Sequence, residues 1–319
     1  MKPGERNLIT DVAGLKLGHA EDRAARTGVT VVLPDRPARA AVDVRGGGPG
    51  TRETDALALD TLVETVDAVV LAGGSVYGLG AADGLTALLG ASGRGFALVE
   101  TPGVPPSPIV PAAVIYDLSN GGRKDWGEDL PYRRLGMKAF EAAGLAPELG
   151  AVGAGTGATA GAYGGGFGSA SVVTEEGITL GAAAVVNSFG SPYAPGTKSF
   201  WAAPFEMNKE FGGRPAPAEG SAQGWPPDTK LGAGPRQNTT IAVIATDAPL
   251  GCADLKRIAI MAHDGLGRAL RPAHGPTDGD TIFALSTGGA ELLRDPLSIT
   301  RLGHLAADTL ARAIARGVF

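Results

Sequence analysis

The chain has 319 residues, of which 44% are hydrophobic and 19% are charged, and a formal net charge of −5. This composition is typical of a soluble globular protein, and the charge gives no reason to expect nucleic acid or an acidic membrane surface as a partner. No apolar run approaches the ~18 residues of a membrane-spanning helix, and no apolar segment follows the N-terminus, so we expect a cytoplasmic protein. The single cysteine excludes an intrachain disulfide framework.

Strand and helix patterns alternate along the first part of the chain. Short runs rich in β-branched residues predict buried strands at residues 28–34, 40–46, 67–73, 112–118 and 178–189. Helices are expected at residues 54–66, where the apolar spacing is imperfect, and at residues 76–89. This mixture predicts an α/β fold.

Glycine is the unusual component of the sequence. It accounts for 50 of 319 residues, more than twice the ~7% average. The glycines cluster at residues 45–51, 71–84 and 153–171, between strand-like runs. Glycines so placed allow one backbone to approach another backbone or a ligand closely, and they supply the positive φ angles of turns.

The regular pattern stops between residues 190 and 238. This stretch contains eight prolines and predicts a long irregular loop, which is usually functional or disordered when it lies inside a compact domain. An interdomain linker is the alternative. However, the 81 residues that follow carry only two strands and two helices, too few to bury a separate core, so we expect a single domain. These elements are expected at residues 239–247, 253–270, 280–287 and 301–315, the last with Thr300 as N-cap.

The triplet Asn238-Thr239-Thr240 joins this loop to a strand. If the chain is cut between Asn238 and Thr239, the new α-amine, with a pKa near 8, can act as general base for the threonine hydroxyl. The same hydroxyl can make the cut by attacking the preceding carbonyl. The alternative from the residues alone is a turn that enters a strand, which asparagine favours.

Other kinds of site find little support. The four histidines, at positions 19, 263, 274 and 304, form no HExxH motif, so we expect no metal. The sequence GAGTG is followed by no clear helix and no acidic residue on a later strand, and GxxxxGK[ST] is absent. We therefore expect no cofactor.

Seven separated motifs, spread over nearly the whole chain, resemble the self-processing aminopeptidase family of L-aminopeptidase/D-esterase-amidases, β-aminopeptidases and 6-aminohexanoate-oligomer (nylon oligomer) hydrolases. They include LAGGSVYGLGAADG (71–84), NTTIAVIATD (238–247) and GPTDGDTIFALST (275–287), with the others at residues 7–33, 42–55, 109–118 and 153–161. The resemblance implies an αββα sandwich similar to N-terminal-nucleophile hydrolases. It also implies a precursor that cuts itself into residues 1–238 and 239–319, with Thr239 as nucleophile.

The triplet with threonine favours the nylon-oligomer hydrolase branch, since many relatives carry serine at the nucleophile. The resemblance implies an amide hydrolase without a cofactor that acts on short peptides, amino-acid amides, β-peptides or ω-amino-acid oligomers. It further implies a homo-oligomer, a tetramer of processed units. An uncut, non-catalytic or acyl-transferring relative that binds a small amine or acyl ligand is the alternative function.

The resemblance also implies roles for particular residues. Asp278 and Asp280 would hold the Thr239 amine, Asn187 would help to form the oxyanion hole, and Tyr116 would donate to the same oxyanion. From the residues alone, other readings stay open: the Asp-Gly-Asp sequence at 278–280 also suits a hairpin turn or part of a calcium loop, Asn187 a strand end, and Tyr116 a core aromatic.

One position departs from the family pattern. Many relatives carry a lysine with a part in processing where this chain has Ala162. Slower maturation, a substituted donor, or a chain altered to stay uncut would each follow from that change. Lys198 and Arg236 are the basic residues of the loop that we consider as substitutes.

Overall fold

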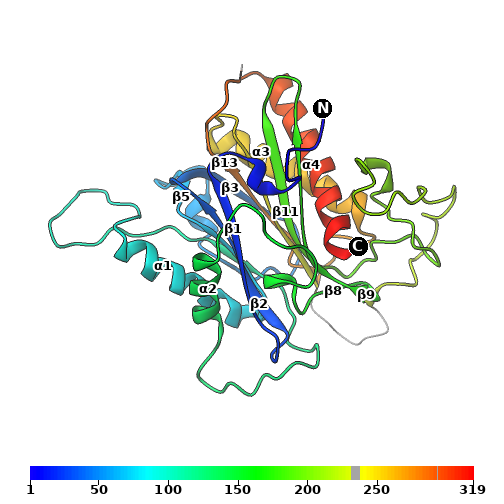
Figure 1. Ribbon diagram of the computed structural model, residues 1–319, viewed down its shortest axis with the longest axis horizontal. Coiled ribbons are helices and arrows are strands. Elements are labelled where there is room, and N and C mark those ends of the chain that lie inside the picture. The colour runs from blue at the N-terminus through cyan, green and yellow to red at the C-terminus, as the bar shows by residue number, and fades with distance from the viewer. Residues whose placement is uncertain (231–237, 293) are drawn as a thin grey trace.

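Two β-sheets lie face to face, and helices cover both outer faces (Figure 1). The computed structural model describes residues 1–230, 238–292 and 294–319. Its layers run helix, sheet, sheet, helix, which confirms the predicted αββα sandwich. Within these residues no helix is long and apolar enough to cross a membrane.

The larger sheet holds the strand that follows the predicted cut. β12 and its neighbour β13 are parallel and lie in the centre of this sheet, whereas the other pairs are antiparallel. Asn187 stands directly opposite Thr239 in the register of β11 and β12. The strand order is β10 (Gly166–Val173), β11 (Thr179–Asn187), β12 (Thr239–Thr246), β13 (Thr281–Ser286), β3 (Ala38–Val44), β5 (Thr65–Val66).

The second sheet consists mainly of residues from the first third of the chain. Its strand order is β1 (Leu15–Asp22), β2 (Thr27–Pro34), β6 (Val69–Ala72), β7 (Ala112–Val114), β4 (Thr51–Arg52). A separate two-stranded sheet pairs β8 (Thr159–Ala160) with β9 (Tyr163–Gly164). The turn that leads to β8 carries part of the third predicted glycine cluster, residues 153–171, close to Asn187.

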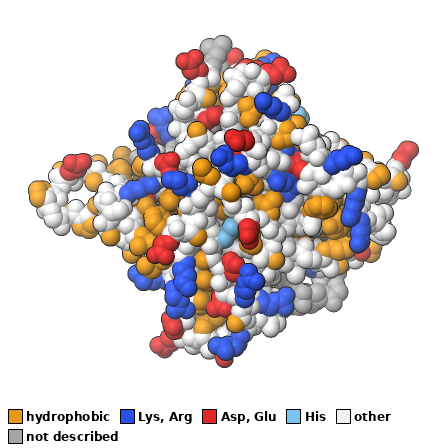
Figure 2. Space-filling view, viewed as in Figure 1, with side chains coloured by type: hydrophobic (Ala, Val, Ile, Leu, Met, Phe, Trp, Pro, Cys, Tyr) orange, Lys and Arg blue, Asp and Glu red, His pale blue; other side chains and the backbone are white. Residues whose placement is uncertain are grey.

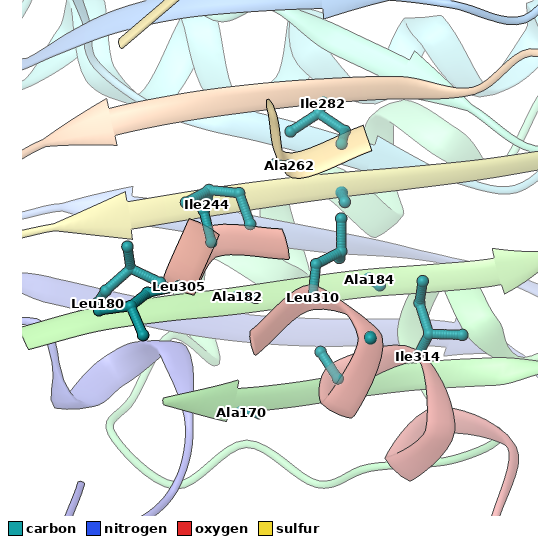
Figure 3. Close-up of a cluster of buried hydrophobic side chains, with 14 of the residues drawn as sticks. Ala170, Leu180, Ala182, Ala184, Ile244, Ala262, Ile282, Leu305, Leu310 and Ile314 are labelled. Carbon is teal, nitrogen blue, oxygen red and sulfur yellow. The ribbon is translucent and has the colours of Figure 1, made fainter. Parts of the chain in front are cut away.

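Helices α3 (Cys252–Ala269) and α4 (Pro296–Val318) pack on the larger sheet, and α1 (Ala81–Ala91) and α2 (Tyr132–Glu141) pack on the smaller one. Leu310 and Ile314 of α4 lie over small alanines of β10 and β11 (Figure 3). The approach is close because a Cβ added at Gly168 would lie 1.9 Å from the Ala313 carbonyl oxygen. Glycine is therefore required where α4 crosses β10.

A second core fills the space between the sheets. On β12 the side chains of Ile241 and Val243 point into this inter-sheet core, whereas Ala242 and Ile244 face the helices. Every residue of β12 is buried, as expected for a central strand covered on both faces. Thr239, at its first position, is thus held by a rigid element.

The predicted helix at residues 54–66 is wrong. The structure has one 3-10 turn at Asp55–Leu57 and strand β5, with Leu59 and Leu62 exposed. The apolar residues of this stretch therefore do not line a buried helical face. Strand β7 is also shorter than predicted.

Helix α4 starts earlier than predicted. Asp295, rather than Thr300, is its N-cap: the carboxylate accepts a hydrogen bond of 2.7 Å from the Ser298 backbone N–H, and Pro296 occupies the first turn. The sequence patterns do not predict β1, β10 or α2, although β10 overlaps the glycine cluster at residues 153–171.

The loop after β11 contains one 3-10 helix, Ala203–Phe205, among its described residues. It is packed against the body by buried Phe200 and Phe211 and by an ion pair between Glu210 and Arg312 of α4. Lys230, the last described residue before the gap at 231–237, lies beside the end of β11: its backbone N–H donates to the Phe189 carbonyl at 3.2 Å.

Candidate active site

Thr239 lies at the end of the larger sheet where three functional segments meet. These are the end of β11, the start of β12 and the 275–280 turn that leads into β13. Five of the site residues predicted from the sequence are buried, whereas Tyr116 is half-buried. The buried ones are Asn187, Asn238, Thr239, Asp278 and Asp280. The parallel pairing of β12 with β13 explains why acids far along the chain lie beside Thr239.

The Thr239 hydroxyl is in contact with the peptide bond that precedes it. Its Oγ1 donates a hydrogen bond to the Asn238 carbonyl oxygen. The Gly279 backbone N–H donates to the same carbonyl at 2.9 Å and also approaches Thr239 Oγ1 at 3.2 Å. One amide therefore polarises the carbonyl that the hydroxyl would attack.

Sequence reasoning missed Gly279. A Cβ at this position would lie 2.7 Å from Thr239 Oγ1 and 2.9 Å from the Gly48 carbonyl oxygen, so only glycine fits without a shift. The signal for it in the sequence is the glycine between the two acids of the Asp-Gly-Asp sequence.

Asp280 is held by two partners on opposite sides. Its Oδ1 accepts from the Thr240 backbone N–H at 2.7 Å, and its Oδ2 accepts from the backbone N–H of His274 at 3.0 Å and lies 2.8 Å from that residue's Nδ1. In the continuous chain Asp280 thus contacts the amide next to Thr239, not that of Thr239 itself.

Asp278 has a different environment. Its Oδ2 accepts from the Gly275 backbone N–H at 2.6 Å, while the buried Oδ1 has no hydrogen-bond partner among the described residues. Burial, together with the negative charge of Asp280, raises the pKa of Asp278 to about 6. At neutral pH Asp278 is therefore an ionised carboxylate with raised proton affinity.

The first glycine cluster fixes the acidic turn. The Arg45 N–H donates to the Asp280 carbonyl at 2.9 Å and the Gly48 N–H to the Asp278 carbonyl at 2.8 Å. A Cβ at Gly46 would lie 2.1 Å from the Asp278 carbonyl oxygen. Close backbone approach, expected from the glycine clusters, thus positions the two acids.

Three groups determine the orientation of the Asn187 side chain. Its Oδ1 accepts from the Thr159 backbone N–H at 3.0 Å and from Lys230 Nζ at 3.1 Å, and its Nδ2 donates to the Tyr116 carbonyl at 3.1 Å. The second Nδ2 proton has no acceptor in the part of the chain that the structure describes. Tyr116 takes part through its carbonyl, whereas its hydroxyl was the predicted donor.

A cavity of about 260 Å³ adjoins Asn187. Its wall includes Tyr116, Lys230, Arg26, Asp117 and Asn120. This volume lies just below the ~300–1,000 Å³ of pockets for drug-sized ligands, so it suits a small acyl group. A larger cavity of about 620 Å³ lies by the N-terminal end of α4 and contains none of the predicted site residues.

Of the two basic residues considered as substitutes for the family lysine, Lys198 is exposed, and Arg236 falls outside the described residues. Ala162 is exposed too, and its N–H donates to the Asp228 carbonyl at 2.9 Å. Lys230, two residues after Asp228, is a buried lysine. It was not predicted from the sequence because no spacing or motif marks it. No group of three or more potential metal ligands occurs among the described residues.

The fold and site define a class: hydrolases of peptide or amide bonds built on the N-terminal-nucleophile hydrolase fold. The chain belongs to peptidase family S58, whose model matches residues 7–319. An uncharacterized aminopeptidase of Mycobacterium tuberculosis is 47% identical over 331 residues, which cover 98% of this chain and 93% of the relative. The 6-aminohexanoate-oligomer endohydrolase of Paenarthrobacter ureafaciens is 30% identical over 336 residues, with coverages of 98% and 86%.

Solved structures with a similar fold also carry the names of aminopeptidases or amidases. A β-aminopeptidase of a Burkholderia species superposes with a TM-score of 0.72 at 25% identity, over 99% of this chain and 87% of the other. The L-aminopeptidase D-Ala-esterase/amidase of Ochrobactrum anthropi gives a TM-score of 0.72 at 23% identity, covering 99% and 86%, which shows the shared fold. The family resemblance inferred from the motifs is confirmed.

Proposed function

We propose that the chain cuts itself between Asn238 and Thr239 and then hydrolyses amides with Thr239 as an N-terminal nucleophile. The observation that carries the proposal is the contact of the Thr239 hydroxyl with the Asn238 carbonyl, whose oxygen also accepts a hydrogen bond from the Gly279 N–H. A nucleophile and an oxyanion donor therefore meet at a single peptide bond.

Self-cleavage would proceed through an ester. Thr239 Oγ attacks the Asn238 carbonyl carbon, the bond from that carbon to the Thr239 nitrogen breaks, and the hydroxyl proton is transferred to the departing nitrogen. Asp278, with its raised pKa and a buried Oδ1, is the carboxylate that we assign to relay this proton. Water then hydrolyses the ester, which leaves a carboxylate on Asn238 and a free hydroxyl and amine on Thr239.

In turnover the new Thr239 amine would act as the base. A free α-amine has a pKa near 8, and the carboxylates of Asp278 and Asp280 would hold it beside the hydroxyl. Thr239 Oγ attacks the substrate carbonyl carbon, the substrate C–N bond breaks, and the amine leaves with the proton that the Thr239 amine has taken from the hydroxyl. The acyl group stays on Thr239 Oγ as an ester, and the oxyanion that precedes it would be stabilised by the Gly279 N–H and by Nδ2 of Asn187. Water releases the acid and regenerates the hydroxyl.

We propose short peptides, amino-acid amides, β-peptides and ω-amino-acid oligomers as substrates. The names of the relatives, an aminopeptidase and a 6-aminohexanoate-oligomer endohydrolase, support this range. So does the small cavity beside Asn187, which would accommodate the acyl part of a short substrate.

Intact mass of the purified protein under denaturing conditions tests the proposal. We expect two masses, corresponding to residues 1–238 and 239–319, and a single full-length mass for Thr239→Ala. The cut protein is then assayed against amino-acid p-nitroanilides and 6-aminohexanoate oligomers. A single full-length mass for both proteins would overturn self-processing and favour an uncut, ligand-binding relative.

A further inference from the structure

Lys230 is 4% exposed, which is unusual because lysine is rarely buried without partners. Its Nζ donates to both the carbonyl oxygen and the side-chain Oδ1 of Asn187, at 2.9 and 3.1 Å. Burying an ammonium group is costly, so a lysine held in this way marks a position where charge is needed. It also lines the cavity beside Asn187.

We propose that Lys230 is a positioning residue that fixes Asn187 as an oxyanion donor, in self-cleavage and in turnover. This inference rests on the proposed function. With Lys230 and the Thr159 N–H both donating to Oδ1, a flipped amide would place its NH2 group against two donors. Lys230 therefore keeps Asn187 Nδ2 on the side of the Tyr116 carbonyl, to which it donates one proton. The second Nδ2 proton is then available to an oxyanion.

The positive charge would also strengthen the donor. A charge-assisted hydrogen bond to Oδ1 withdraws electrons from the amide and makes Nδ2 a better donor. Charges act strongly in a site from which water is largely excluded, and an oxyanion that develops beside Asn187 would lie near the Lys230 ammonium.

The field of Lys230 reaches the acidic turn as well. Its positive charge lowers the pKa of Asp278, against the larger effects of burial and of Asp280. Lys230 is thus electrostatically coupled to both halves of the site, Asn187 on β11 and the acids before β13. The segment that carries Lys230 also runs beside Ala162, since the Ala162 backbone N–H donates to the Asp228 carbonyl.

Self-cleavage gives a readout that does not depend on the unknown substrate. Full-length precursor is made by cell-free translation, and the rate constant of chain cleavage is followed on denaturing gels. We expect Lys230→Met to cleave about a hundredfold more slowly, similar to loss of an oxyanion donor. Lys230→Arg, which keeps the charge, should recover to within about tenfold of wild type. Lys198→Met, an exposed lysine of the same loop, is the matched control and should be unchanged.

A double-mutant cycle separates positioning from general stabilisation. In an Asn187→Ala background, Lys230→Met should slow cleavage less than about threefold, because the donor that it positions is gone. If the effects of the two substitutions on the cleavage rate are fully additive, or if Lys230→Met cleaves at the wild-type rate, the proposed role of Lys230 is overturned. The proposed function would stand in either case. If Lys230→Met fails to fold, as judged by thermal melts in a Thr239→Ala background, Lys230→Arg must still cleave faster than Lys230→Gln. An uncut wild type would overturn the proposed function and this inference with it.

Discussion

Gly279 carries the most restrictive geometry at the residue scale. Because a Cβ at this position would lie 2.7 Å from Thr239 Oγ1, Gly279→Ala must displace either the hydroxyl or the turn. We expect self-cleavage to slow at least a hundredfold, since near-attack geometry is lost, and overpacking to cost about 1–3 kcal/mol of stability. Denaturing gels and thermal melts measure the two effects. Gly289→Ala, where an added Cβ meets no atom within 4 Å, is the control, and equal cleavage by both variants would contradict the geometry.

Asp278 should make both cleavage and stability depend on pH. Its pKa of about 6 predicts that self-cleavage slows about tenfold per pH unit below pH 6, as the proposed base becomes protonated. The free energy of unfolding depends on pH in the opposite direction from the cleavage rate: it falls as the pH rises. A raised carboxyl pKa means that the folded state binds the extra proton, so the cost of the buried charge is absent below the unfolded pKa and appears as pH rises through 6.

Asp278→Asn tests this pair of effects. Compared in a Thr239→Ala background, where no chain is cut, Asp278→Asn should melt a few degrees higher at pH 7.5 than its parent, with the difference vanishing towards pH 4. In the wild-type background the same substitution should abolish cleavage. A lower melting temperature at pH 7.5 would show that the carboxylate stabilises the fold and that its pKa is not raised.

A site residue could be predicted from the sequence only where it lies in a recognisable motif. Thr239 and Asn187 stand at the ends of apolar strands, and Asp278 and Asp280 flank a glycine, so a motif exposes each of them. Lys230 lies in an irregular loop with no periodicity, and its contact with Asn187 depends on the path of that loop. Such a contact is visible only in three dimensions.

At the element scale, strand order explains how two chains would stay together after a cut. Both strands from residues 239–319, β12 and β13, lie between β11 and β3 of the preceding part. Backbone pairs join Leu180–Asn187 to β12 on one side and Arg39–Val44 to β13 on the other. Cutting one peptide bond just before the first residue of β12 removes none of this pairing, so we expect the chains to separate only on denaturation.

The same scale shows where sequence patterns fail. The central strands were recovered because a strand buried on both faces reads as a continuous apolar run. The helix predicted at residues 54–66 is wrong because the spacing of its leucines suggested a buried helical face, yet Leu59 and Leu62 are exposed. Strand β10 was missed because its glycines and serines, which admit α4, lack the β-branched signature of strands.

Arg312 of α4 joins three distant segments. Its guanidinium, 2% exposed, pairs with Glu210 of the long loop and donates to the Ser171 carbonyl at 2.9 Å and to Asn7 Oδ1 at 2.8 Å. Glu210→Ala would leave this cation buried without its carboxylate partner. We expect a loss of about 3–5 kcal/mol in the free energy of unfolding, measured by urea denaturation in the Thr239→Ala background. Asp125→Ala, which breaks an exposed pair with Arg123, should cost under about 1 kcal/mol.

At the scale of the whole molecule, one segment stands away from the body. Residues 92–108 form an arm, closed by the Phe96–Ser107 bridge, that projects at the left of Figure 1. Leu98, Val99 and Val104 on this arm are 64% to 76% exposed, and hydrophobic side chains mark the same projection in Figure 2. An apolar projection of this kind is costly in water and typical of a surface that another chain covers.

We predict that this arm packs on a second copy of the chain, within the homo-oligomer that the family resemblance implies. Light scattering after size exclusion should give a mass several times that of one 32.0 kDa chain, and Leu98→Glu with Val99→Glu should reduce it. A buried carboxylate without a partner opposes association far more than it disturbs an exposed loop, so the melting temperature should change little unless assembly itself stabilises the fold. Leu297→Glu, 59% exposed at the start of α4, should leave the mass unchanged. A wild-type mass of one chain would contradict the prediction, because the arm would then remain in solvent.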